Sequence, residues 1–230
     1  MLEISDLRFG HGMQQMTADK LVLSPGIIGV IGASGSGKST FLNVISGFHR
    51  EDQGQIKFEG QDITAFRVED RPVTMLFQSN NLFPHLSIFR NVALALTSRR
   101  RLSNNERLRI EDALSRVGLA GYANRKPGEL SGGQQSRAAL ARVLLQKKPI
   151  LLLDEPFAAL GPALRNEMLD LVQEIAQSEN QIVLLVTHAP EDAIRICKET
   201  LFISGGKVWS AGETRRALNQ IPDEMRDYFG

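Results

Sequence analysis

Short apolar runs of strand length alternate along the chain with longer segments in which apolar residues recur at helical spacing. This pattern predicts strands at residues 2–9, 20–23, 27–31, 55–58, 73–77, 150–154, 182–187, 200–203 and 207–210. A helix is expected directly after Gly37, where Phe41, Leu42 and Ile45 share one side. The last two strands flank Gly205-Gly206, which is typical of a hairpin.

The middle of the chain reads instead as a helical insert. Ser103 and Glu106 have the spacing of a capping box ahead of one helix. A second helix is expected from about Ser131 to Lys147, and a proline stops it at position 149. We therefore assign residues 79–148 to a helical segment that interrupts the strand-rich parts.

Strands and helices alternate again after the insert, with helices expected at residues 162–177 and 190–198. Alternating strands and helices imply an α/β fold with a mainly parallel sheet covered by helices. We expect one domain over residues 1–230, with its strand-rich parts at about residues 1–78 and 149–230.

Composition adds few constraints. The chain has 27 basic and 26 acidic side chains, so no overall field attracts it to nucleic acid or to an anionic bilayer. No uncharged apolar run approaches the roughly 20 residues needed to span a bilayer, and we see no secretory signal. Cys197, the single cysteine, excludes an internal disulfide, fits a reducing compartment and reads as a buried filler. Any membrane role is thus expected to pass through a partner protein.

Residues 32–39 read Gly-Ala-Ser-Gly-Ser-Gly-Lys-Ser and fit the pattern G-x-x-x-x-G-K-[ST] between a strand and a helix. Glycines let the backbone wrap around phosphate oxygens, and the helix N-terminus supplies partial positive charge. Lys38 would reach the β- and γ-phosphates, and the Ser39 hydroxyl would coordinate Mg²⁺. The expected nucleotide contacts are Gly32, Ser34, Gly35, Ser36, Gly37, Lys38, Ser39 and Thr40.

The strand expected at residues 150–154 ends in two adjacent carboxylates, Asp154 and Glu155. Ligands of open α/β sheets bind at the carboxyl ends of the strands, so both should lie near the phosphate-binding loop. Asp154 then belongs near the Mg²⁺ held by Ser39. Glu155 can be directed at the water that attacks the γ-phosphate, a role typically worth about 10²–10⁴-fold in rate.

A second candidate phosphate contact is the segment Leu-Ser-Gly-Gly-Gln at residues 130–134, where a helix starts. Ser131 can cap this helix, and Gly132 and Gly133 expose N–H groups to an anion. Two phosphate-binding helix starts exceed what one nucleotide needs from one subunit. The phosphate-binding loop, this segment, the Asp-Glu pair and a downstream histidine, in that order, resemble the motif set of the ATP-binding cassette ATPases.

The resemblance implies the P-loop NTPase fold of those ATPases. That fold has a RecA-like, mainly parallel core, an N-terminal antiparallel β-subdomain and an inserted helical subdomain. The resemblance also implies a homodimer with ATP and Mg²⁺ bound between its subunits. In such a dimer Ser131, Gly132, Gly133 and Gln134 of one subunit close on the γ-phosphate held by the other.

Two further residues take roles from the resemblance. Gln78 matches the glutamine that contacts Mg²⁺ or the attacking water and senses the membrane partner. His188 matches the histidine that contacts the γ-phosphate. The implied catalytic residues are Glu155, His188, Gln78 and Lys38, and the implied metal ligands are Ser39, Gln78 and Asp154.

Residues 78–87 resemble the matching stretch of bacterial importers that use an external solute-binding protein. Leu82, Phe83 and Leu86 could line a groove for the coupling helix of a membrane permease, or could be satellite core contacts. Among importer ATPases the resemblance favours those for thiamine, and those for ferric ion or polyamines are similar. It implies a location at the cytoplasmic face of the membrane and no nucleic-acid partner.

Two departures from the family pattern stand out. Gly161 occupies the position of an aspartate that usually helps to link the two sites across the dimer. An aromatic residue that stacks on adenine is not evident; His11 lies at about the expected place, and Phe9 is the alternative.

Two other functions stay open from the sequence. A soluble cassette ATPase could act in DNA repair, translation or cofactor assembly, although a long coiled-coil insertion and a second cassette are both missing here. A nucleotide-dependent assembly switch with little hydrolysis is suggested by Gly161, and Glu155 argues against it.

Overall fold

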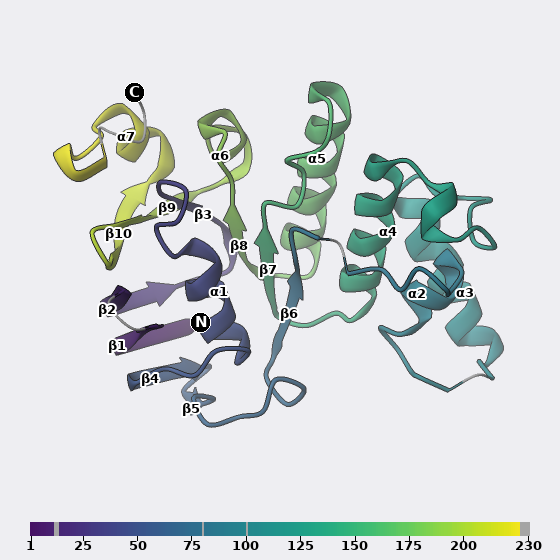
Figure 1. Ribbon diagram of the computed structural model, residues 1–230, viewed down its shortest axis with the longest axis horizontal. Coiled ribbons are helices and arrows are strands. Elements are labelled where there is room, and N and C mark those ends of the chain that lie inside the picture. Colours follow the sequence, from purple (N-terminus) through teal and green to yellow (C-terminus); the bar gives the residue numbers. More distant parts are fainter. Residues whose placement is uncertain (12–13, 80, 100, 226–230) are drawn as a thin grey trace.

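A computed structural model describes residues 1–11, 14–79, 81–99 and 101–225, and within them ten strands form one mixed sheet (Figure 1). The strands are β1 (Leu2–His11), β2 (Gln14–Leu23), β3 (Gly26–Ile31), β4 (Gln53–Phe58), β5 (Gln61–Asp62), β6 (Val73–Leu76), β7 (Ile150–Asp154), β8 (Ile182–Val186), β9 (Glu199–Ser204) and β10 (Lys207–Glu213). Their order across the sheet is β5-β4-β1-β2-β10-β9-β3-β8-β7-β6.

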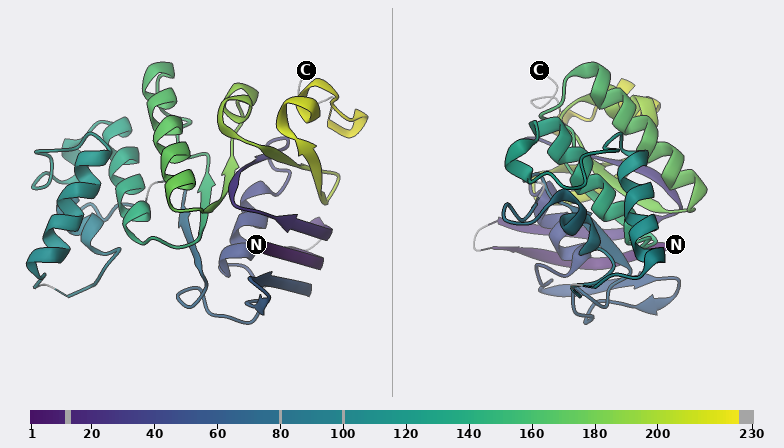
Figure 2. Two further views of the ribbon diagram at one scale, coloured as in Figure 1. Left: turned by 180° about the vertical axis from the view of Figure 1, so that it is seen from behind. Right: turned by 90° about the vertical axis from the view of Figure 1, so that its right-hand side faces the viewer.

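Helices cover the sheet and form a separate group at one end of the molecule. They are α1 (Lys38–Ser46), α2 (Ile88–Ala93), α3 (Asn104–Arg116), α4 (Gly132–Leu145), α5 (Pro162–Ser178), α6 (Pro190–Ile196) and α7 (Thr214–Asn219), with 3₁₀ turns at Pro127–Glu129 and Asp223–Met225. Figure 1 shows α2, α3 and α4 together, on the opposite side of the parallel strands from β1, β2 and β4. The view from behind in Figure 2 shows the same separation. None of the helices in the described ranges is long and apolar enough to cross a membrane.

The parallel part of the sheet consists of β6, β7, β8, β3 and β9. Most residues of β3, β6, β7 and β8 are apolar and buried, as expected of strands that are covered on both faces. In β7, Ile150 and Leu152 share a core cluster with Phe41 of α1, whereas Leu151 and Leu153 share the other cluster with residues of α5. The carboxyl ends of these strands therefore meet at one edge, where the loops after β3, β6, β7 and β8 come together.

The other part of the sheet is antiparallel, since β1 pairs with β2 on one side and with β4 on the other. Its inner face packs on α1, where the rings of Phe9 and Phe41 have centroids 5.9 Å apart. The helix α1 is thus held between the two parts of the sheet. This position fixes the loop that precedes α1.

Helix starts predicted from capping signals are confirmed. The Ser103 side chain caps α3 in a capping box with Glu106, and Ser131 caps α4 in a capping box with Gln134. Short or polar elements differ more from expectation. The strand β2 begins at Gln14 rather than near residue 20, and α2, β5 and α7 were not anticipated.

Candidate functional site

The loop at residues 32–37 joins the buried strand β3 to the N-terminus of α1. Gly35 and Gly37 have φ values of 76° and 99°, in the region that favours glycine. A Cβ on Gly37 would lie 2.1 Å from Met16 Sδ, and one on Gly32 would lie 2.3 Å from the Ile203 carbonyl oxygen. The loop therefore needs glycine at these positions, and its bare backbone can approach phosphate oxygens closely.

Lys38 is buried at the start of α1 and is tied to the loop before it. Its Nζ donates hydrogen bonds to the carbonyl oxygens of Gly32, at 2.8 Å, and Ala33, at 2.7 Å. Burial lowers the pKa of Lys38, and the neighbouring carboxylates of Glu155 and Asp154 oppose that shift. An ammonium group has three donors, so one remains for a phosphate oxygen.

Asp154, the last residue of β7, is buried and has a hydrogen bond with the Ser39 side chain. Burial raises the pKa of Asp154, and the hydrogen bond from Ser39 partly offsets this. Its Oδ1 is buried without a hydrogen-bond partner in the described part of the chain. A buried carboxylate oxygen is costly unless a donor or a cation satisfies it.

The donor chemistry around Asp154 fits Mg²⁺, which prefers oxygen ligands and is usually held by one or two carboxylates plus substrate phosphates. The Ser39 hydroxyl and the Asp154 carboxylate supply such oxygens. Within residues 1–11, 14–79, 81–99 and 101–225 no group of three or more His, Cys, Asp or Glu could hold a metal by itself.

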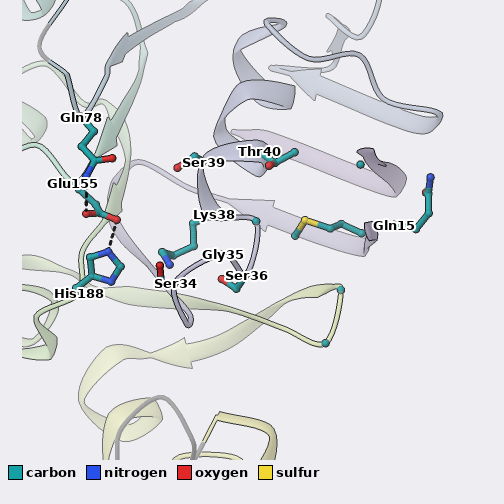
Figure 3. Close-up of a pocket in the computed structure, with 15 residues that line it drawn as sticks. Gln15, Ser34, Gly35, Ser36, Lys38, Ser39, Thr40, Gln78, Glu155 and His188 are labelled. Carbon is teal, nitrogen blue, oxygen red and sulfur yellow. Dashed lines mark hydrogen bonds and ion pairs between the residues drawn. The ribbon is translucent and has the colours of Figure 1, made fainter. Parts of the chain in front are cut away.

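Glu155 follows β7 with a left-handed backbone, φ 48°. This region costs a glutamate roughly 1–2 kcal/mol and is often occupied at functional sites. Its N–H donates to the Val186 carbonyl oxygen at 3.2 Å. Glu155 Oε1 contacts His188 Nε2, and Gln78 Nε2 donates to Glu155 Oε2 at 3.4 Å (Figure 3). The loops after β6, β7 and β8 thus bring three predicted residues together.

One cavity of about 760 Å³ joins the phosphate-binding loop to this cluster. It is lined by Gly10, Gln15, Met16, Ser34, Gly35, Ser36, Gly37, Lys38, Ser39, Thr40, Gln78, Glu155, His188, Gly205 and Gly206. Figure 3 shows Gln78, Glu155 and His188 at one end, Lys38 and Ser34 in the middle and Gln15 at the other end. Gly32 and Asp154 belong to the same site but do not line the cavity.

The segment at residues 131–134 lies elsewhere, at the N-terminus of α4. Ser131 Oγ accepts a hydrogen bond from the Gln134 N–H at 3.3 Å, and Gln134 Oε1 accepts one from the Ser131 N–H at 3.0 Å. Ser131 and Gly132 are exposed, while Gly133 and Gln134 are partly buried. The two anion-binding candidates are therefore not brought together within one subunit.

The environment of Phe9 corrects one prediction about adenine stacking. Phe9 is wrong as a stacking residue, because it is fully buried against Phe41. The side chain of His11 lies outside the described part of the structure. Gln15 and Met16 also line the cavity, and both were missed because the polar first half of β2 was not recognised as a strand from the sequence.

Comparison with known proteins decides the family. A family model described as "ABC transporter" matches residues 20–158. The chain belongs to the ABC transporter family. It is 48% identical over 230 residues to the "Thiamine import ATP-binding protein ThiQ" of Ruegeria sp. (strain TM1040), covering 100% of both chains. It is 45% identical to the protein of the same name from Brucella abortus biovar 1 (strain 9-941), covering 100% of this chain and 95% of the other.

Solved structures agree with this assignment. One is titled "Dimeric structure of a post-hydrolysis state of the ATP-binding cassette MJ0796 bound to ADP and Pi", with a TM-score of 0.79 at 27% identity over 90% of this chain and 96% of that one. Another, the "Dimeric Structure of MJ0796, a Bacterial ABC Transporter Cassette", has the same TM-score, identity and coverage. The predicted α/β cassette fold is confirmed, and the protein is an ATP-binding ATPase of a transporter.

Proposed function

We propose that this protein hydrolyses ATP to power the import of thiamine, or of a closely related small solute, through a partner membrane permease. The named relatives match the whole length of this chain at 45% and 48% identity, which supports a shared solute. The observation that carries the chemistry is the convergence of Lys38, Ser39, Glu155 and His188 on one cavity. The same observations argue against a soluble cassette or a switch with little hydrolysis.

Nucleotide binding follows from the loop and α1. The triphosphate of ATP would lie along the N–H groups at residues 34–39, with the third donor of Lys38 on a terminal phosphate oxygen. Ser39 and Asp154 would hold Mg²⁺, and Gln78 would approach it from the loop after β6. When bound, this ion neutralises phosphate charge during transfer.

Hydrolysis would depend on Glu155. Its carboxylate accepts a hydrogen bond from the attacking water and directs the water oxygen at the γ-phosphorus. A bond would form between the water oxygen and the γ-phosphorus as the bond between the γ-phosphorus and the bridging oxygen of ADP breaks, and Glu155 would take the proton that the water loses. Contacts from His188 and Gln78 to the two carboxylate oxygens fix the direction of Glu155. ADP and phosphate are the products.

Two chains would form the complete site. The exposed Ser131 and the start of α4 lie outside the cavity of their own subunit, which supports a role in a partner's site. The dimeric cassettes to which this chain is similar support the same arrangement. In it, Ser131, Gly132, Gly133 and Gln134 of one copy would meet the γ-phosphate held by Lys38 of the other.

The permease would dock where the helical part meets the sheet. A groove of about 440 Å³ there is lined by Phe48, Phe77 and Arg142 among others, and Phe48 is 57% exposed. Phe83 is 47% exposed, whereas Leu82 is packed against the core, so Phe83 is the better contact of the two. Docking would hold the protein at the cytoplasmic face of the membrane. A solute-binding protein would act from the opposite face, through the permease.

Uptake of labelled solute by cells that lack this chain tests the proposal. We expect thiamine uptake to return with the wild-type chain and with Lys20→Ala, a control at an exposed lysine, but not with Lys38→Ala. Uptake of ferric ion or a polyamine instead would overturn the solute. Uptake of all three that is independent of this chain would overturn the transport role.

A further inference from the structure

A partly buried ion pair lies behind the catalytic cluster, and neither of its residues lines the cavity that contains Lys38. Arg165, in the first turns of α5, has its Nε 3.1 Å from Asp192 Oδ2 in α6. The Asp192 side chain is 9% exposed, and that of Arg165 is 26% exposed. The Arg165 Nε–H is not aligned for a hydrogen bond, so charge attraction holds the pair. A cavity of about 20 Å³ is lined by both residues and by Glu155 and His188.

Thr187 connects this pair to the loop that carries His188. The Thr187 side chain is buried, and its Oγ1 donates to Asp192 Oδ2 at 2.8 Å. Thr187 Oγ1 also accepts a hydrogen bond from the Ala189 N–H at 3.1 Å. One hydroxyl therefore fixes the backbone on both sides of His188. The His188 side chain is 41% exposed, so packing alone does little to hold it.

We propose that Thr187, Asp192 and Arg165 are positioning residues that hold His188 in contact with Glu155. The inference rests on the proposed role of His188 in hydrolysis. Asp192 fixes Thr187, Thr187 fixes residues 187–189, and the charge of Arg165 keeps the Asp192 carboxylate in place. A catalytic contact is sensitive to errors of about 1 Å, which can cost on the order of 10²-fold in rate.

The location of Arg165 gives this network a second consequence. Arg165 lies four residues after Gly161, at the start of α5, and Gly161 provides no side-chain cap. The loop at residues 158–161 comes directly after the catalytic segment. The contacts of Arg165 with Asp192, and of Asp192 with Thr187, therefore link the start of α5 to the loop that carries His188.

The chain offers a matched control for the ion pair. Arg195 of α6 and Asp170 of α5 join the same two helices, with Nε–Oδ1 at 2.9 Å and Nη2–Oδ2 at 2.8 Å. This pair is more exposed, at 42% and 54%, and lies near the other end of α6. If α5 and α6 only need to be tied together, losing either pair should have the same effect.

The first experiment measures kcat and KM for ATP with the purified chain. We expect Thr187→Val, which removes the hydroxyl at nearly constant shape, to lower kcat about 10-fold with KM changed less than about 2-fold. Thr187→Ser should restore most of the turnover because it keeps the hydroxyl. Arg165→Met should lower kcat as Thr187→Val does, and Arg195→Met should not. Equal losses from both arginine variants would overturn the inference.

A double-mutant cycle separates positioning from general damage. In a His188→Ala background, Thr187→Val should cause no further loss, because it acts through His188. Losses that multiply would overturn the inference and leave the proposed function intact. Wild-type turnover in His188→Ala would overturn both this inference and the proposed role of His188. If Thr187→Val does not fold, the same cycle with Arg165→Met decides.

Discussion

At the scale of single residues, Glu155 has the most demanding environment. Its backbone is left-handed, its side chain is 14% exposed, and its carboxylate contacts His188 and Gln78. Glu155→Gln preserves the shape but removes the charge that attracts a proton from water. We expect turnover to fall at least about 10²-fold while ATP still binds, so that ATP-bound dimers accumulate on size-exclusion chromatography. Glu167→Gln, at an exposed position of α5, should behave as wild type.

Cys197 allows a prediction about pH. Burial raises the pKa of its thiol to about 12 from a usual 9.0. Well below pH 9 the thiol is protonated in both the folded and the unfolded chain and does not affect the pH dependence of stability. Between pH 9 and 12 the unfolded chain loses this proton and the folded chain keeps it. The free energy of unfolding therefore falls by up to about 1.4 kcal/mol per pH unit as pH rises.

Urea denaturation at pH 8 and pH 10 measures the contribution of Cys197 to the free energy of unfolding. The wild type should lose more stability between the two values than Cys197→Ala, since other groups titrate equally in both proteins. Parallel losses would mean that the thiol is accessible to water in the folded state.

Candidate site residues that belong to a short sequence motif could be identified from the sequence. Lys38 and Ser39 follow a glycine-rich loop, and Asp154 and Glu155 come at the end of an apolar strand, so local spacing was enough to propose them as site residues. Thr187 and Asp192 carry no such signal. Their hydrogen bond joins a loop to the side of a helix, and Arg165 reaches them from another helix. Such contacts depend on how α5 and α6 pack, which periodicity does not specify.

At the scale of elements, the N-terminus of α5 could be made more stable by a better N-cap residue. Gly161 is the N-cap with φ −66°, and a Cβ there would meet no atom within 4 Å. In Gly161→Asp the carboxylate can accept hydrogen bonds from the first turn of α5, and the unfolded chain loses flexibility. We expect the free energy of unfolding to rise by about 0.5–1 kcal/mol in urea denaturation.

A second glycine provides the contrast for this prediction. Gly121 also has open space around a Cβ, but its φ is 83°. Gly121→Asp should therefore fail to stabilise the protein. Equal effects at the two positions would show that backbone conformation and capping do not account for the gain.

Strands and helices were predictable where their pattern is long and apolar. In the first half of β2, the buried residues Met16 and Ala18 alternate with polar residues. Two apolar residues, one of them only an alanine, were too few to predict a strand from the sequence. Pairing with β1 along its whole length forms this strand nevertheless. The helix α2 has six residues, fewer than two turns, so its spacing could not be distinguished from a loop.

At the scale of the whole molecule, the phosphate-binding loop and the start of α4 lie on different parts of one chain. Lys38 is the first residue of α1, and Ser131 caps α4. Figure 1 shows α1 beside the sheet and α4 in the separate helical group. If two copies complete each other's sites, every site takes Lys38 from one chain and Ser131 from the other. If one chain is sufficient, both residues act within the same copy.

Mixing two inactive variants distinguishes these arrangements. Lys38→Ala and Ser131→Arg should each abolish turnover alone, because every homodimer has two defective sites. A mixed dimer concentrates both defects in one site and leaves the other with Lys38 and Ser131 intact. We expect an equal mixture, exchanged before ATP is added, to regain up to about a quarter of the wild-type sites, as random pairing of two chains requires. A mixture that stays inactive, although labelled chains are shown to pair, would mean that Ser131 does not act across the dimer.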